Sequence, residues 1–200
     1  MSDPVHSMRF AVVDTETTGL FPATDRVLQI GVVIVRGDGT IEHQFSTHIK
    51  RLVLKPGRLG AHHVHGITRV DLLRGMPPEI ALQELQELLQ GATFTAHNAP
   101  FDLGFLRSEA KRANFELDIP AHVCTLKMSR ALDPQSTKSH KLSEIAKRYN
   151  IVNERQHDAL ADALITAAVL PRLLGELHIT TVDQLARFTS TDRPRHSAQP

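Results

Sequence analysis

The sequence is poor in the residue types that mark several large protein classes. It has 1 Cys, so it can form neither an internal disulfide nor a cysteine-based zinc finger, and a cytoplasmic setting fits this count. Apolar stretches such as residues 32–35 are far shorter than the ~20 residues of a membrane-spanning helix, so no membrane partner is expected. Aromatic residues make up 4%, which leaves no visible stacking platform for a long single strand.

An excess of one charge is also lacking. The chain has 23 Lys and Arg against 22 Asp and Glu, a formal net charge of +1, so contact with nucleic acid has to come from a local arrangement of side chains. We expect a flexible N-terminus over residues 1–8, one domain over residues 9–177 and a C-terminal extension over residues 178–200. Residues 190–200 hold two prolines and no large apolar residue, so we expect them to be disordered.

The hydrophobic pattern predicts an α/β domain. Runs that are apolar on both faces indicate buried strands, and helical spacing takes over after Pro77. Strands joined antiparallel and then mixed with helices favour a mixed sheet. The predicted elements are strands over residues 9–14, 27–35, 41–49, 92–96 and 121–125, and helices over residues 77–91, 98–113, 139–149 and 158–174.

Acidic residues stand at the ends of these predicted elements. Asp14 and Glu16 point to the same face of the first strand, where two carboxylates repel each other unless a cation lies between them. Asp102 falls in the opening turn of a helix that we expect Asn98 to cap with its side chain. The helix dipole alone would favour a carboxylate at Asp102 by ~0.3–1 kcal/mol, so each motif by itself has an ordinary structural explanation.

The last acidic motif consists of His157, Asp158 and Asp162. Asp162 comes five positions after His157, which would place the two side chains roughly 140° apart on one helix. The conflict disappears if Asp158 is the helix N-cap, so that His157 lies outside the helix and Asp162 projects from its body. In the alternative, His157 is an ordinary surface histidine.

Taken together, these residues are typical of a site for two metal ions. Mg²⁺ prefers carboxylate and water oxygens, and two ions ~3.5–4 Å apart can stabilise both the attacking and the leaving oxygen of a phosphoryl displacement. A histidine with an ordinary pKa of ~6.5 can accept a proton from the attacking water. We therefore expect two Mg²⁺ or Mn²⁺ ions, with His157 as the general base and activity that rises with pH.

Four motifs, in order, carry a resemblance to a known family. From about Met8 to Leu174 the chain resembles the DEDDh family of 3′–5′ exonucleases, the DnaQ-like group that includes the proofreading subunit of bacterial replicative DNA polymerases. The resemblance implies a ribonuclease H-like fold, with a mixed five-stranded sheet flanked by helices. The motifs span residues 13–20, 65–68, 97–102 and 157–162.

The resemblance also implies residue roles. Asp14, Glu16 and Asp162 would hold the first metal ion, Asp14 would also hold the second, and Asp102 would bind the water shell of the second. His157 would be the general base. The residues implied to bind the last nucleotide are Thr15, Thr17, Val64, His65, Asn98 and Phe101.

The implied function is a metal-dependent 3′–5′ exonuclease that releases nucleoside 5′-monophosphates from single-stranded or frayed DNA ends, with proofreading as one role. One alternative is an RNA-directed enzyme similar to ribonuclease T or oligoribonuclease. Another is a non-catalytic module that binds nucleic-acid ends or a polymerase. The presence of all four acids and His157 argues against the last alternative.

Two further segments bear on partners. Gln184–Phe188 resembles the motif with which replication proteins dock on the bacterial sliding clamp. The alternative, which we favour, is a short amphipathic helix begun by Thr181 or Asp183, with Leu185 and Phe188 packed on the domain. A basic stretch could neutralise phosphates behind the terminal nucleotide or simply face solvent; it comprises Lys50, Arg51, Lys55 and Arg58.

Overall fold

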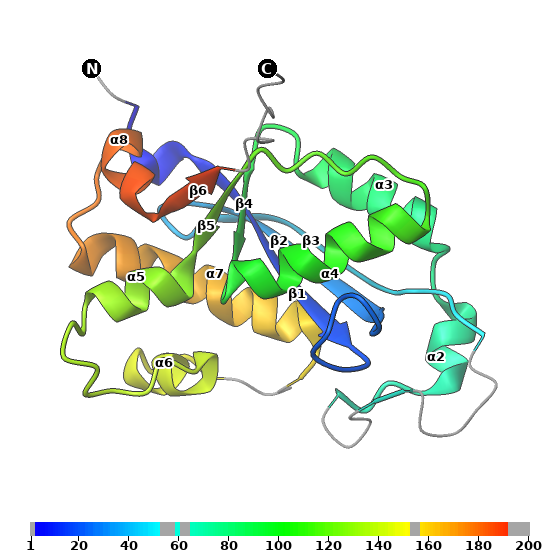
Figure 1. Ribbon diagram of the computed structural model, residues 1–200. Helices are drawn as coiled ribbons and strands as arrows, with labels where there is room; N and C mark the ends of the chain where they lie inside the picture. The colour runs from blue at the N-terminus through cyan, green and yellow to red at the C-terminus, as the bar shows by residue number, and fades with distance from the viewer. Residues whose placement is uncertain (1–2, 53–58, 61–64, 153–156, 192–200) are drawn as a thin grey trace, which may run out of the picture.

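A mixed sheet with helices on both faces forms the domain (Figure 1). The computed structural model describes residues 3–52, 59–60, 65–152 and 157–191. The six strands lie in the order β3-β2-β1-β4-β5-β6. Their bounds are β1 Arg9–Thr17, β2 Val27–Arg36, β3 Ile41–His48, β4 Thr93–Ala96, β5 Ala121–Cys124 and β6 Thr189–Thr191.

The strand pairing agrees with the predicted mixed sheet. β1, β2 and β3 form an antiparallel meander, and β4 and β5 continue the sheet parallel to β1. The sheet has one strand more than the five expected, because β6 pairs antiparallel with β5. Ser190 and Thr191 lie in β6, so the expectation of disorder from residue 190 was wrong for these two residues; residues 192–200 lie outside the described part of the chain.

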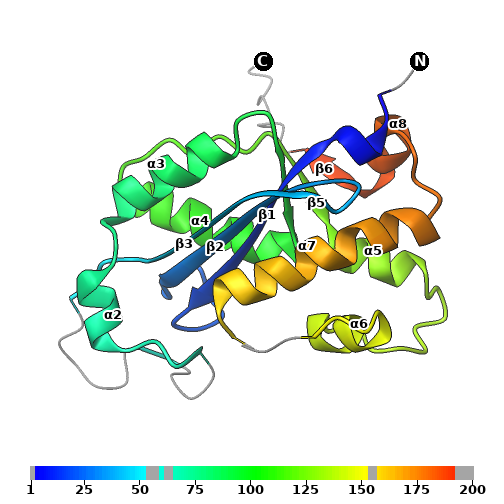
Figure 2. The same cartoon turned by 180° about the vertical axis from the view of Figure 1, so that it is seen from behind.

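Helices cover the two faces of the sheet unequally. α3 and α4 pack on one face against Ala11 and Val13 of β1, whereas α5, α6 and α7 share a core on the other face with Phe10 and Val12 (Figures 1 and 2). The helices are α2 Arg69–Arg74, α3 Pro78–Leu88, α4 Ala99–Arg112, α5 Thr125–Ala131, α6 Leu142–Arg148, α7 Ala159–Glu176 and α8 Val182–Leu185, with 3₁₀ turns at Val5–Ser7 and Ala186–Phe188.

The two ends of the described chain pack against each other. Val5 is buried, and its backbone N–H donates to the carbonyl of Thr180 at 2.9 Å, in contrast to the flexible N-terminus expected over residues 1–8. α8 begins at Thr181, and Leu185 and Phe188 are buried in the core shared with α7. The packed-helix interpretation of Gln184–Phe188 is thereby confirmed, because both apolar residues of the clamp-like motif face the domain.

None of the described helices combines the length and the apolar composition needed to cross a membrane.

β2 and α7 approach each other closely at Gly31. Gly31 pairs with Asp14 of β1, and a β-carbon at Gly31 would lie 2.3 Å from the carbonyl carbon of Ala159 and 2.4 Å from the backbone nitrogen of Leu160. Both of these atoms belong to the backbone, so neither can move without shifting the first turn of α7. The missing side chain at Gly31 therefore sets how closely α7 approaches the end of β1.

We expect Gly31→Ala to destabilise the fold by about 1–3 kcal/mol, because the added methyl overlaps the backbone of α7. Urea unfolding monitored by circular dichroism measures this loss. Gly175→Ala is the matched control, since Gly175 lies in α7 with no atom within 4 Å of an added β-carbon. That helical change should be neutral or stabilise by about 0.5–1 kcal/mol. Equal unfolding midpoints for the two variants would contradict the close approach at Gly31.

Candidate active site

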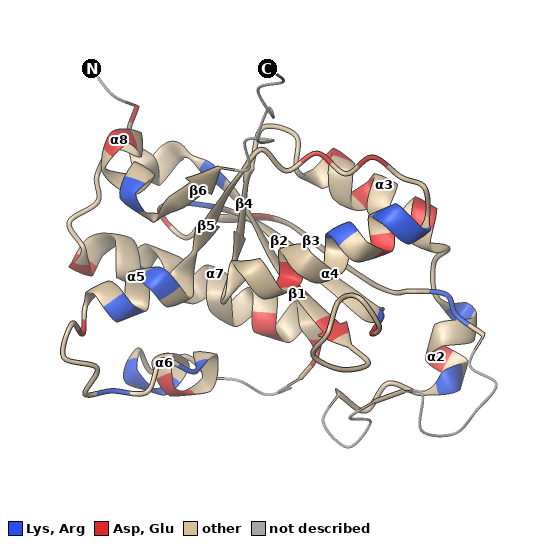
Figure 3. Cartoon of the chain, in the orientation of Figure 1, with Lys and Arg blue, Asp and Glu red and all other residues tan. Residues whose placement is uncertain are grey.

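The predicted acidic residues meet where β1 extends beyond its parallel neighbour. Only Phe10–Val12 of β1 pair with β4, so Asp14 and Glu16 stand past the end of that pairing, at the carboxyl edge of the parallel strands. Asp102 comes from α4 and Asp162 from α7. Figure 3 shows the acidic positions of β1, α4 and α7 at the centre of the molecule. In open α/β sheets, this edge is where ligands bind.

The carboxyl end of β1 places site residues on both faces of the sheet. Side chains alternate along β1, so Asp14 and Glu16 share the α7 face with Val12, whereas Thr15 shares the α4 face with Val13. The hydroxyl of Thr15 donates to Asp102 Oδ1 at 2.9 Å, and both side chains are buried. The structure therefore places Thr15, predicted to bind substrate, where its hydroxyl fixes a carboxylate of the site.

The residue that precedes α4 has an unusual backbone conformation. Asn98 occupies the N-cap position with a left-handed backbone (φ 71°) and makes no side-chain cap hydrogen bond. The prediction that its side chain caps the helix was therefore wrong, although the helix does begin at Ala99. The left-handed conformation turns the chain sharply from β4 into α4, and Asp102 in the first turn is 3% exposed.

α7 begins as the motif spacing predicts. Asp158 is the N-cap, and its Oδ1 accepts the N–H of Ala161 at 3.0 Å. His157 precedes the cap with φ 66° and is exposed, while Asp162 lies one turn into the helix. Potential ligand atoms of Glu16, His157 and Asp162 all lie within 4.8 Å of one another. The structure thus brings His157 to the carboxylates without placing it in the helix.

Gln29 is the residue of this site that the sequence did not reveal. It is 4% exposed in β2, and its Nε2 donates to Asp158 Oδ2 and to Ser46 Oγ, both at 3.1 Å. Its Oε1 accepts the N–H of Ala159 at 3.3 Å. Gln29 therefore adds a second cap to α7 from the neighbouring strand. The available signal was one amide within an otherwise apolar strand, because a buried polar group needs hydrogen-bond partners.

Burial, together with repulsion at Asp14 and Glu16, raises the pKa values of the carboxylates. Burial and the charges of Asp162, Asp158 and Asp102 raise the pKa of Glu16 to about 8. Burial and then the charges of Asp102, Asp162 and Glu16 raise the pKa of Asp14 well above its ordinary value. Burial raises the pKa of Asp102 to about 7, although the Thr15 hydrogen bond opposes that rise.

A bound cation would offset this repulsion. The donor set is rich in carboxylate oxygens, with one histidine nitrogen beside them, and such a set suits Mg²⁺ or Mn²⁺ better than a metal that prefers sulfur. The residues present therefore fit the divalent ions expected from the sequence.

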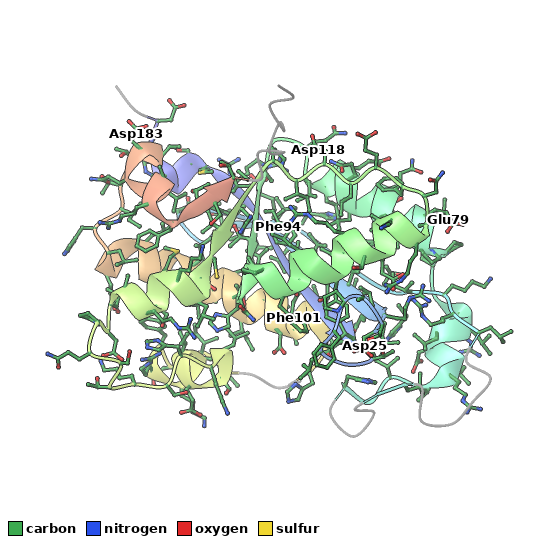
Figure 4. All side chains as sticks on the ribbon, viewed as in Figure 1. Asp25, Glu79, Phe94, Phe101, Asp118 and Asp183 are labelled. Carbon is green, nitrogen blue, oxygen red and sulfur yellow. The ribbon has the colours of Figure 1, made fainter. Side chains whose placement is uncertain are left out.

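The other residues expected to bind a nucleotide differ in their surroundings. Phe101 lies in the first turn of α4 (Figure 4) and packs against Phe105 with 4.9 Å between ring centroids. The Thr17 hydroxyl donates to the carbonyl of Gly19 at 2.6 Å. His65 accepts the N–H of Ile67 at 3.0 Å, and its Nε2 lies 2.9 Å from the carbonyl of Leu59. Val64 lies outside the described residues.

The basic stretch before His65 is not a uniform phosphate-binding surface. Arg51 is largely buried and contacts Glu109 at 3.3 Å and the carbonyl of Val27 at 3.2 Å. Glu109 also pairs with Arg26 at 2.7 Å, so Arg51 belongs to an ion-pair network behind the loop that follows β1. Neither of the two interpretations of this stretch, phosphate contact or exposure to solvent, describes Arg51, and Lys55 and Arg58 lie outside the described residues.

Comparison with known proteins assigns this arrangement to a family. A family model described as "Exonuclease" (RNase_T) matches residues 11–170. The chain belongs to this exonuclease family. The match includes both ends of the acidic constellation, from β1 to α7.

Individual relatives agree with the family. The chain is 31% identical over 189 residues to 3′–5′ exonuclease DinG of Bacillus subtilis, covering 92% of this chain and 20% of DinG. It is 35% identical over 183 residues to a DNA polymerase III subunit epsilon-like protein of Rhodobacter capsulatus, covering 87% of this chain and 25% of that protein. It therefore corresponds to a quarter or less of these relatives.

A solved structure shares the fold over nearly its whole length. Exonuclease X in complex with 5′-overhanging duplex DNA superimposes with a TM-score of 0.68 at 25% identity. The match covers 90% of this chain and 98% of that one. The ribonuclease H-like α/β fold expected from the motifs is therefore confirmed, with the additional strand β6.

The raised carboxyl pKa values predict that stability in the absence of metal falls as pH rises. The folded protein binds more protons than the unfolded chain between the ordinary pKa of Glu16 at 4.5 and its folded value of about 8. Stability from such groups is complete below the unfolded pKa and is lost as pH rises through the folded pKa. In EDTA, the melting temperature should therefore fall between pH 5 and 8.5.

Asp162→Asn should flatten this profile and raise the melting temperature at pH 8 by roughly 2–4 °C, the shift expected for 1 kcal/mol in a chain of this size. It removes one of the charges that raise the pKa values of Asp14 and Glu16. Differential scanning fluorimetry measures the effect, with Glu79→Gln, an exposed carboxylate on α3, as control. Parallel profiles for all three proteins would contradict the repulsion described.

Gln29→Ala should lower kcat for exonuclease digestion about 10- to 100-fold with little change in KM, because α7 and its site residues lose a lateral support. Gln29→Glu should lower kcat as well, since it replaces the donor to Asp158 with a second carboxylate. Steady-state kinetics measures both variants, with Gln44→Ala on the exposed side of β3 as control. Wild-type kcat in Gln29→Glu would contradict a positioning role for the donor.

Proposed function

We propose that this protein is a 3′–5′ exonuclease that releases nucleoside 5′-monophosphates from DNA ends with the help of two divalent metal ions. The observation that supports the proposal is the convergence of four carboxylates and an exposed histidine at one strand end; they are Asp14, Glu16, Asp102, Asp162 and His157. Family membership supplies the reaction class.

Each carboxylate has its own role in binding the two ions in this proposal. Asp14, Glu16 and Asp162 would hold the first Mg²⁺ or Mn²⁺, Asp14 would also hold the second, and Asp102 would act through the second ion's water shell. When bound, the ions supply positive charge beside both the entering and the leaving oxygen of the scissile phosphate. Thr15 and Gln29 contribute by fixing the carboxylate of Asp102 and the start of α7.

His157 is the proton acceptor in this proposal. The attacking water forms the new phosphorus–oxygen bond and gives its proton to the imidazole, while the bond to the 3′-oxygen breaks with its electron pair. The 3′-oxygen then takes a proton from solvent. His157 suits this step because it is exposed, lies outside helix α7, and has a potential ligand atom within 4.8 Å of those of Glu16 and Asp162.

DNA is the substrate we assign, at single-stranded or frayed 3′ ends. The related proteins include an epsilon-like polymerase subunit, and exonuclease X shares the fold in a complex with duplex DNA. Proofreading beside a polymerase, and action in the cytoplasm, are further parts of this proposal. The clamp-like motif does not contribute to it, because Leu185 and Phe188 are buried.

Digestion of 5′-labelled single-stranded DNA and RNA of identical sequence tests the proposal. We expect a ladder that shortens from the 3′ end with Mg²⁺ or Mn²⁺, no shortening with EDTA, and faster digestion of the DNA. Asp14→Ala should remove the activity. Faster digestion of RNA would reassign the substrate, and no shortening of either strand with either metal would overturn the enzymatic function.

The pH dependence of the same reaction tests the role of His157. At saturating metal, kcat should rise between pH 5.5 and 8 as a histidine base loses its proton. His157→Ala should lower kcat by about 10²- to 10⁴-fold, the usual contribution of a positioned base, and should abolish this rise. A flat wild-type profile would contradict the assignment of His157.

A further inference from the structure

Basic side chains gather on one side of the acidic site, although the whole chain has a net charge of only +1. The segment from Lys127 to Arg148, which forms most of α5, the following loop and α6, carries six Lys and Arg and two acidic residues. Figure 3 shows blue positions on α5 and α6, beside the red positions of β1, α4 and α7. This segment alone has a net charge of +4, so the rest of the chain has a net charge of −3.

The two acidic residues of this segment form hydrogen bonds or ion pairs within the segment itself. Asp133 is buried and accepts the Thr137 hydroxyl and the Lys138 backbone N–H, each at 2.8 Å. Glu144 pairs with Lys147 at 2.7 Å. Arg130, Lys138 and Lys141 are exposed and form no ion pair with any described residue, so they present their charge to solvent.

This segment is attached directly to the site. His97 Nε2 donates to the carbonyl of His140 at 2.9 Å, and its Nδ1 accepts the hydroxyl of Thr125, the first residue of α5, at 3.1 Å. Burial lowers the pKa of His97 to about 4, so the ring is neutral and can hold both hydrogen bonds. The next residue is Asn98, at the entrance to α4. The basic segment therefore keeps a fixed position beside the expected nucleotide pocket.

Internal contacts also hold the loop between α5 and α6 in place. Ser129 Oγ lies 2.9 Å from His140 Nδ1, and His140 Nε2 lies 3.3 Å from Asp133 Oδ2. The Lys138 backbone donates to the same carboxylate. The backbone that carries Lys138 and Lys141 is thus preorganised, which lowers the entropy cost of binding an anion there.

The surface at α3 is acidic. α3 carries three glutamates and no basic residue, and Glu116 and Asp118 lie in the connection from α4 to β5. Glu79 and Asp118 are labelled on this side in Figure 4. The glutamates of α3 therefore repel a polyanion locally.

We propose that the phosphate backbone upstream of the reacting nucleotide runs over Arg130, Lys138 and Lys141, which we term the cationic track. The proposal rests on the exonuclease function proposed above and adds the path of the substrate strand. With few aromatic residues to stack bases, phosphate contacts supply the affinity for that strand. Each contact to a single strand releases counterions and contributes a slope of about −0.7 to log K against log salt.

The test compares a substrate that has an upstream strand with one that has none, and the ratio between them is compared across variants so that the difference in leaving group cancels. The p-nitrophenyl ester of thymidine 5′-monophosphate has none, whereas a 20-nucleotide oligothymidylate has a long one. For the triple variant Arg130→Gln, Lys138→Gln, Lys141→Gln, the ratio of kcat/KM for the oligomer to that for the ester should fall about 10-fold. The salt slope of oligomer binding should become shallower by about 2, for three lost contacts.

A matched triple variant carries the same loss of charge elsewhere. Arg36→Gln, Arg69→Gln, Arg74→Gln removes three exposed cations from β2 and α2 and should keep the wild-type ratio and salt slope. An equal fall in this control, or no change in the ratio for the track variant, would overturn the cationic track.

Binding separates this inference from the proposed function. If the wild type digests neither substrate, fluorescence anisotropy of the labelled oligomer in EDTA still compares the two triple variants. Weaker binding with a shallower salt slope in the track variant alone would support the track in a protein that binds strands without cutting them. Equal binding by both variants would overturn it.

Discussion

Burial of the carboxylates, joined by repulsion among them at Asp14 and Glu16, is the constraint on which this site depends. Asp14, Glu16 and Asp102 all have raised pKa values, with burial as the first cause, so the fold gives up stability at neutral pH to keep them together. The two hydrophobic cores on either side of the sheet offset that loss. A divalent cation placed among the carboxylates would reverse the sign of the interaction, from repulsion to shared attraction.

The supports of the site follow from the geometry of a strand. Because successive side chains of β1 point to opposite faces, the end of β1 contacts both helical layers. Asp14 and Glu16 face α7, while Thr15 reaches Asp102 on α4. On the next strand, Gly31 lets α7 come close and Gln29 holds its first turn. The site residues of α4 and α7, which lie far apart in the sequence, are thus positioned by the adjacent strands β1 and β2.

Sequence reasoning recovered what depends on local patterns. Strand runs, the N-cap at Asp158 and the position of His157 outside the helix all follow from the spacing and chemistry of neighbouring residues. The roles of Gln29 and Arg51 depend on partners far along the chain, namely Asp158 and Glu109. β6 was missed because its three polar residues carry no hydrophobic pattern typical of a strand. They form a strand by pairing with the edge of β5. At Asn98 the local pattern was misleading. Asparagine is typical of a helix N-cap, but here the residue has a left-handed backbone and its side chain makes no cap hydrogen bond.

An acidic catalytic centre faces a problem when its substrate is a polyanion. Bound divalent ions would neutralise the carboxylates only near the reacting phosphate, because screening limits electrostatic reach to about 8–10 Å at physiological salt. The rest of a nucleic-acid strand therefore experiences the electrostatic potential of the protein surface outside the site. In this chain that field is asymmetric, because α3 is acidic and the segment from Lys127 to Arg148 is basic while the total stays near zero. A nearly neutral protein can direct a strand in this way, since the direction of approach depends on where its charges lie and not on their sum.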